Sequence, residues 1–101
     1  MQKRTRNLSV QVLPLREDAV SVVDRAIKVI QESGLRYEVG PLETTLEGED
    51  LDELLDVAKR AHQACFDAGS EQVVTFIKIA DALGGPRMME KTSKYRGGEG
   101  R

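Results

Sequence analysis

The chain has 101 residues, a formal net charge of −2 and a single cysteine. A chain of this length forms one domain, and its weak negative charge argues against a nucleic-acid binder held by phosphate contacts. One cysteine cannot form an intramolecular disulfide, and no apolar run approaches the ~20 residues of a membrane span or forms a signal peptide, so we expect a cytoplasmic protein without membrane partners.

Composition predicts where the folded domain begins and ends. Residues 1–7 are polar and contain a basic cluster of Lys3, Arg4 and Arg6, which is typical of a solvated, flexible tail. Residues 8–95 carry the periodic patterns and are expected to form the domain. The Gly-rich residues 96–101 are expected to be a disordered tail.

The first strand pattern spans residues 8–15, and a helix pattern follows over residues 18–33. In the strand, one face carries Val10 and Val12, and the residues between them face the other way. Gly34 is expected to end the helix, because a left-handed backbone costs glycine little. Apolar residues at spacings of three and four predict one buried stripe on this helix: Val20, Val23, Ile27 and Ile30.

Two short strand patterns come next, Arg36–Val39 and Glu43–Glu47. A turn is expected near Gly40, because the proline that follows it cannot donate to a sheet ladder. The second helix pattern covers residues 51–68, and Asp50 is placed to cap it. The apolar stripe expected on this helix comprises Leu51, Leu54, Ala58, Ala61, Cys65 and Ala68.

Residues 72–80 form the last strand pattern, which is so continuously apolar that both of its faces are expected to be covered. A loop over residues 81–86 and a short helix over residues 87–95 are expected to follow. The order βαββαβ predicts an α+β ferredoxin-like two-layer sandwich, in which two helices cover one face of a four-stranded antiparallel sheet. The other face stays open, and apolar residues on it such as Leu13 favour burial against another copy.

Few residues are arranged for catalysis. His62 and Cys65 lie three apart on a helix, but no second His or Cys completes a metal site, and the apolar stripe buries the thiol. Residues 84–87 are Gly-rich but lack the spacing of a phosphate loop. Phe76 is the one aromatic residue of the last strand, which disfavours RNA binding by base stacking. We therefore expect no metal, no cofactor and no enzymatic activity.

Polar residues on the predicted strands are the remaining candidates. They either stay solvated and bond one another across strands, or they bind a small nitrogen heterocycle near an oligomer interface. In the second case a carboxylate would accept from an amino group or pair with a protonated ring nitrogen, and an aromatic ring would cover the ligand. The group comprises Ser9, Gln11, Thr44, Thr45, Glu47, Thr75 and Lys78, with Tyr37 nearby.

Four segments resemble the small thiamine-binding proteins related to the YkoF type. The most specific is ESGLRYEVGPLETTLEG, followed directly by the acidic helix start EDLDELLDVAKRAHQA; SVQVLPL precedes them and VVTFIKI follows. In place of a charged stretch that resembles IDDR in this family, the chain has IADALGG. The resemblance implies a ferredoxin-like fold that assembles into dimers or tetramers through its open sheet faces.

The same resemblance implies that thiamine, or its hydroxymethylpyrimidine moiety, is bound without chemical turnover. Carried over by position, the implied ligand-binding residues are Ser9, Gln11, Tyr37, Thr44, Thr45 and Glu47. If the Glu47 charge pairs with the ligand, Glu47→Gln is expected to weaken binding by roughly 1–3 kcal/mol. Two other functions remain open: an ACT-like regulatory module that binds a small molecule, and a structural or interaction oligomer without a small-molecule ligand.

Overall fold

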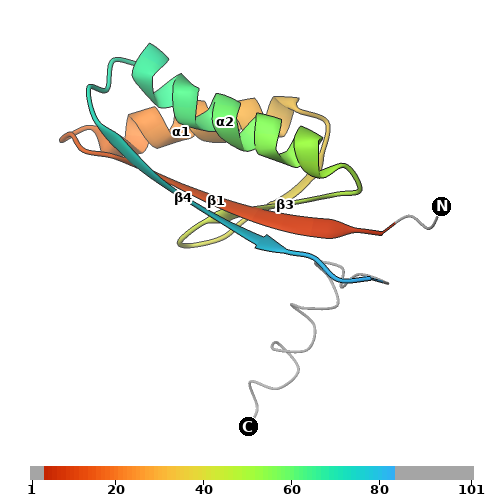
Figure 1. Ribbon diagram of the computed structural model, residues 1–101. Helices are drawn as coiled ribbons and strands as arrows, with labels where there is room; N and C mark the ends of the chain where they lie inside the picture. Colours follow the sequence, from red (N-terminus) through yellow and green to blue (C-terminus); the bar gives the residue numbers. More distant parts are fainter. Residues whose placement is uncertain (1–3, 84–101) are drawn as a thin grey trace, which may run out of the picture.

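The computed structural model describes residues 4–83, which form a four-stranded sheet with two helices packed on one face (Figure 1). All neighbouring strands are antiparallel, in the order β2-β3-β1-β4. This arrangement confirms the predicted ferredoxin-like sandwich. The expected helix over residues 87–95 and the tail over residues 96–101 lie outside the described residues. The elements are β1 (Arg6–Pro14), α1 (Ala19–Glu32), β2 (Arg36–Val39), β3 (Thr44–Gly48), α2 (Leu51–Asp67) and β4 (Val73–Ala80).

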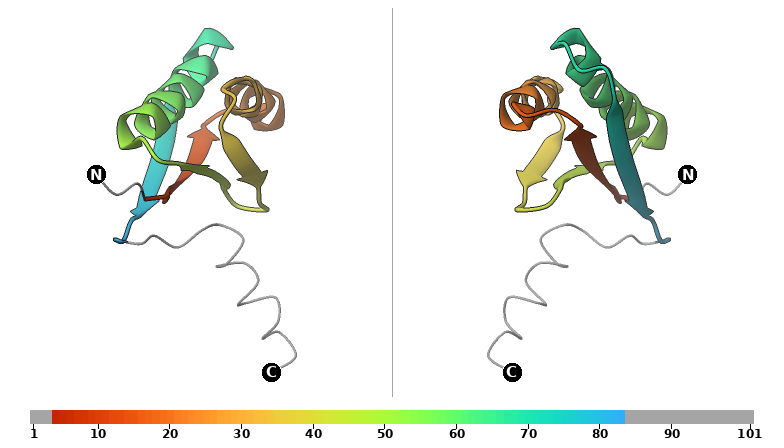
Figure 2. Two further views of the ribbon diagram at one scale, coloured as in Figure 1. Left: turned by 90° about the vertical axis from the view of Figure 1, so that its right-hand side faces the viewer. Right: turned by 90° about the vertical axis from the view of Figure 1, so that its left-hand side faces the viewer.

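The hydrophobic core lies between the sheet and the two helices, which run side by side over the sheet in Figure 2. Leu8 of β1 is opposite Leu46 of β3, and both are fully buried beneath the helices. Neither α1 nor α2 is long and apolar enough to cross a lipid bilayer. The core therefore holds together a two-layer domain whose second sheet face carries no helix among residues 4–83 (Figure 2).

Helix α2 matches its predicted stripe, but α1 does not. In α2 the buried residues include Leu54, Ala58, Ala61 and Cys65, as expected. In α1 the buried row is Val22, Ala26 and Ile30, whereas Val20 is 77% exposed. The predicted stripe was therefore right at Ile30, which is buried, and wrong at Val20; two neighbouring rows of this helix are apolar, and spacing alone cannot rank them.

Strand β1 begins at Arg6, two residues before the predicted start. Arg4 and Arg6 both pair with Asp81 after β4, at 2.9 and 3.0 Å. This part of the basic cluster is therefore an ion-pair network rather than a solvated tail. Partial burial favours a higher pKa for the Asp81 carboxyl, but the Arg6 hydrogen bond and the charges of both arginines outweigh it and hold this pKa below its usual value.

Strand β4 is an edge strand, and within one chain its two faces are not covered as predicted. Phe76 on the open face is 52% exposed, and Ile77 and Ile79 on the helix-facing side are 43% and 46% exposed. The apolar run was correctly assigned to a strand. However, an edge strand lacks a neighbour on one side, so apolar character alone did not establish burial.

Candidate functional site

A cavity lies beneath α1, where β1 extends past the end of the strand that pairs with it. The β1–β3 ladder ends at Val10, which is opposite Thr44, whereas the β1–β4 ladder continues to Pro14. Past Val10, the edge of β1 that faces away from β4 has no strand beside it. The chain reverses in the β2–β3 hairpin at this level, where Gly40 N–H donates to Glu43 C=O at 2.9 Å.

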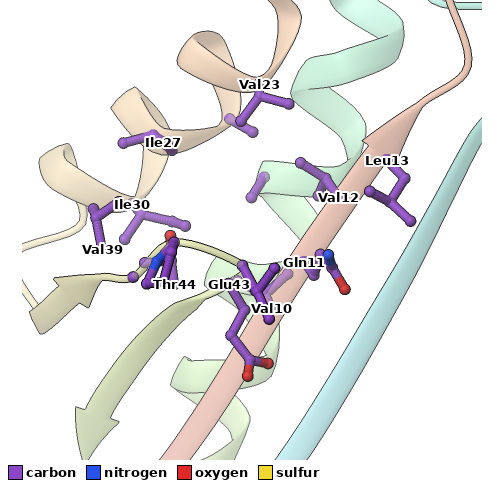
Figure 3. Close-up of a pocket in the computed structure, with 15 residues that line it drawn as sticks. Val10, Gln11, Val12, Leu13, Val23, Ile27, Ile30, Val39, Glu43 and Thr44 are labelled. Atoms are coloured by element: carbon purple, nitrogen blue, oxygen red, sulfur yellow. The ribbon is translucent and has the colours of Figure 1, made fainter. Parts of the chain in front are cut away.

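Helix α1 extends over this gap and encloses a cavity of about 280 Å³. Figure 3 shows Val23, Ile27 and Ile30 of α1 facing Val12 across it. Val39 and the hairpin turn form the wall opposite β1, and the buried Thr44 lies where this wall meets the sheet. The full lining is Val10, Gln11, Val12, Leu13, Val23, Ala26, Ile27, Ile30, Val39, Gly40, Pro41, Leu42, Glu43, Thr44 and Ala61.

Two polar side chains of the cavity, Gln11 and Glu43, lie where it opens to the other face of the sheet. Gln11 lies on that open face, because alternate residues of a strand point to opposite sides. Glu43 directs its carboxylate away from the apolar α1 residues (Figure 3) and lies 3.5 Å from the Lys78 ammonium. The site therefore combines an apolar interior with an amide and a carboxylate at its mouth.

A second polar group lies on the open face, near the start of β1. Glu47 is only 9% exposed and lies 3.6 Å from Arg36 Nη1. The buried Asn7 amide donates to the other oxygen of this carboxylate at 3.4 Å. A second cavity, of about 270 Å³, lies beside this group and is lined by Ser9, Thr45, Glu43 and Lys78, among others. Glu43 therefore contributes both to this second cavity and to the cavity beneath α1.

The structure divides the predicted ligand-binding residues between the two sheet faces. Ser9, Thr45 and Glu47 face the open side, whereas Tyr37 and Thr44 face the helices, because they pair with Leu46 and Val10 respectively. Of the six predicted residues, Gln11 and Thr44 line the cavity beneath α1, and Ser9 and Thr45 line the second cavity on the open face. The six residues therefore do not form one cluster.

Sequence reasoning missed Glu43 and the apolar pair Val23 and Ile27, which line the cavity beneath α1. A usable signal was present in the unequal lengths of the strand patterns, eight residues in 8–15 and five in 43–47. A longer strand beside a shorter one leaves part of its edge free. Such a gap under a helix is a natural place for a small cavity.

His62 and Cys65 take structural roles. The His62 ring shares a 2.6 Å hydrogen bond with Thr75 and packs edge-on against Phe66. Cys65 is fully buried, and burial raises the pKa of its thiol, which makes it a poor nucleophile. Within residues 4–83, no three His, Cys, Asp or Glu side chains are grouped so that they would hold a metal ion.

Comparison with known proteins identifies the family of this fold and sequence. Residues 8–96 match the family described as thiamine-binding protein. A UPF0045 protein of Clostridium perfringens is 43% identical over 94 residues, which cover 91% of this chain and 98% of the relative.

Solved structures are similar over nearly the whole chain. A domain of unknown function, DUF77, from Bacillus cereus has 54% identity and a TM-score of 0.85, with 93% of this chain and 92% of the other covered. A Thermotoga maritima protein, provisionally described as acting in thiamine biosynthesis or salvage, has 37% identity and a TM-score of 0.81, with 91% and 99% coverage.

Proposed function

Because this chain belongs to the thiamine-binding protein family, we propose that it binds thiamine, or the hydroxymethylpyrimidine part of thiamine, without converting it. The observation that carries this proposal is the cavity beneath α1, which has apolar walls and a carboxylate at its mouth. Ligand sites occupy roughly 300–1,000 Å³, so a cavity of about 280 Å³ suits one small ring system. The protein would serve as a cytoplasmic carrier, buffer or salvage component.

The two halves of thiamine match the two ends of the cavity. The flat aminopyrimidine ring would lie between Val23 and Ile27 of α1 and Val39 of the hairpin. The cationic thiazolium ring would lie at the mouth, where it would replace the exposed Lys78 ammonium beside the Glu43 carboxylate. Gln11 and Thr44 remain candidate ligand contacts in this arrangement. Glu47 would lie outside this cavity, on the open face, where it pairs with Arg36 and accepts a hydrogen bond from Asn7.

Calorimetry tests this function. The purified protein is titrated with thiamine and, separately, with hydroxymethylpyrimidine, and we expect saturable binding of both ligands. If neither ligand produces heat while the protein remains folded and assembled, the proposal is wrong, and an oligomer without a small-molecule ligand becomes the better explanation.

We also propose that the protein self-associates through the open sheet face. Leu13, Val74 and Phe76 are neighbours on this face and are 37%, 39% and 52% exposed. Small domains bury a limited fraction of their surface alone, so covering such an apolar patch is favourable. Dimers, or dimers of dimers, are the expected products.

Phe76→Lys is expected to lower the oligomeric mass, measured by light scattering after gel filtration, because a charge at this position opposes burial of the patch. Lys59→Ala, on the exposed side of α2, is the matched control and should leave the mass unchanged. An unchanged mass in folded Phe76→Lys protein would show that another surface holds the copies together.

A further inference from the structure

The direction of the backbone groups along β1 can be followed from one hydrogen bond. Leu15 N–H donates to Gln72 C=O at 3.0 Å, so Leu15 directs its peptide groups toward β4. In an antiparallel ladder, successive residues direct their N–H and C=O groups to alternate sides. Leu13 therefore also directs its backbone N–H and C=O groups toward β4. Val12 directs both of these groups away from β4, to the side where β3 has already ended.

The residue after next and the hairpin hydrogen bonds both fit an unpaired strand edge at Val12. The backbone of Pro14 points to the same side as that of Val12. Proline has no N–H to donate, and because no strand lies on that side, its presence removes no hydrogen bond from the sheet. The hairpin closes through Gly40 and Glu43, and among residues 4–83 no backbone hydrogen bond joins Val12 to the turn. Val12 thus presents one donor and one acceptor, side by side, without a strand to pair them.

These two groups border the cavity. The lining includes Val10 and Val12 from the helix-facing side of β1, and Gln11 and Leu13 from the open side. Because four consecutive residues from both faces of β1 line this cavity, we infer that it runs along the free edge of the strand. The free peptide edge of Val12 is therefore part of the cavity wall.

We propose that this edge recognises the ligand, and that the site selects flat nitrogen heterocycles that carry a ring-nitrogen acceptor next to an exocyclic amino donor. Val12 N–H would donate to the ring nitrogen, and the amino group would donate to Val12 C=O, so the ligand continues the ladder in place of β3. The proposal deepens the function proposed above and rests on it. It explains how a cavity with apolar walls distinguishes an aminopyrimidine from an apolar ring of equal size.

The ligand itself provides the first test. We expect the 4-deamino analogue of hydroxymethylpyrimidine to bind at least about 10-fold more weakly than the parent, because the buried carbonyl loses its donor. The analogue keeps the ring and most of its volume, so apolar contact alone would leave its affinity nearly unchanged. Equal affinity of the two compounds would overturn the proposal.

Hydrogen exchange of the full chain, followed by NMR, gives the site-specific test. In the free protein the Val12 amide should exchange faster than the amides of Val10 and Leu13, which are paired with β3 and β4. Saturating hydroxymethylpyrimidine should slow Val12 exchange by at least about 10-fold and change the two reference amides less.

Replacing the Val12 amide by an ester, with α-hydroxyisovalerate at this position, removes the donor and keeps the side chain. We expect weaker hydroxymethylpyrimidine binding in this variant, whereas the same replacement at Leu13 should lower stability without this loss of affinity. Binding that leaves Val12 exchange and the ester variant unaffected would overturn backbone recognition but keep the proposed function. Absence of binding by the unmodified protein would overturn both.

Discussion

The two halves of β1 belong to one strand but have different surroundings. The first half, Arg6–Val10, pairs with β3 on one side and with β4 over most of its length on the other. The second half, residues 11–14, pairs with β4 alone. On the helix-facing side, Leu8 in the first half is fully buried, whereas Val12 in the second half is only partly buried. A five-residue partner for a nine-residue strand thus gives this domain a closed end and an open end.

Under the proposed function, this difference gives the two ends separate tasks. Strand pairing and apolar packing at the closed end satisfy backbone groups and supply stability. At the open end, the same kinds of groups border a cavity and are available to a ligand. Binding regions are commonly drawn from the less stable parts of a domain, and here both parts lie on one strand.

The largest expected effect is at the closed end. Leu8→Ala should lower the free energy of unfolding by about 2–5 kcal/mol, because it leaves a cavity among fully buried side chains. Val12→Ala, at the open end, should cost clearly less, since Val12 is only partly buried and already borders a cavity. Urea unfolding of both variants measures this difference. Equal losses would show that the two halves contribute equally to stability.

Charge at the mouth of the cavity gives the next effect. Glu43→Gln should weaken thiamine binding by about 1–3 kcal/mol, because the thiazolium cation loses its carboxylate, and should leave the uncharged hydroxymethylpyrimidine nearly unaffected. Calorimetry with both ligands checks this expectation.

Glu47→Gln is the matched control, because Glu47 is the corresponding carboxylate at the closed end. In correctly assembled protein it should change thiamine affinity much less than Glu43→Gln does. The opposite ranking would place the ligand beside Glu47 on the open face, as the family resemblance implies.

Most of the fold was predictable from the sequence because its signals are local. Alternation in residues 8–15 and the caps of α2 depend only on neighbours along the chain, and Asp50 does accept from the backbone N–H groups of Asp52 and Glu53. Gly34 likewise adopts the expected positive φ, 83°. These features needed no knowledge of which strands pair.

The site was less predictable because it depends on register. Tyr37 and Thr44 were carried over together with Thr45 and Glu47 by their position in the family's segment, although alternation sends them to opposite sheet faces. The end of the β1–β3 ladder at Val10 follows from the pairing of distant segments, and this pairing creates the cavity. A periodic pattern in one segment does not contain that information.

The hairpin turn offers a smaller change that should separate binding from stability. A Cβ added at Gly40 would lie 2.9 Å from the Glu43 carbonyl oxygen, so Gly40→Ala should displace the turn, cost about 1 kcal/mol and weaken ligand binding. Gly48→Ala is the control, because its Cβ would meet a Leu54 methyl at 3.3 Å at the closed end. It should affect unfolding but not affinity; equal loss of affinity in both variants would contradict the assignment of binding to the open end.

The smallest expected effect comes from the ion pairs of Asp81, the residue after β4, with Arg4 and Arg6 at the closed end. Asp81 has a lowered pKa in the folded state, so its ion pairs stabilise the fold above the unfolded-state pKa of about 3.9, and this contribution is lost as the pH falls through the folded-state pKa. Asp81→Asn should therefore lower the thermal midpoint slightly at about pH 7, and the difference from the parent should disappear in strong acid.

The control for Asp81→Asn is Asp56→Asn, which removes an exposed pair with Arg60 on α2, worth at most a few tenths of a kcal/mol. It should shift the midpoint less, because this pair joins two positions of one helix, whereas Asp81, after β4, pairs with Arg6 of β1 and with Arg4 just before β1. A midpoint difference for Asp81→Asn that persists in strong acid would show that Asp81 acts through shape or neutral hydrogen bonds. The closed end would then owe its stability to packing and strand pairing alone.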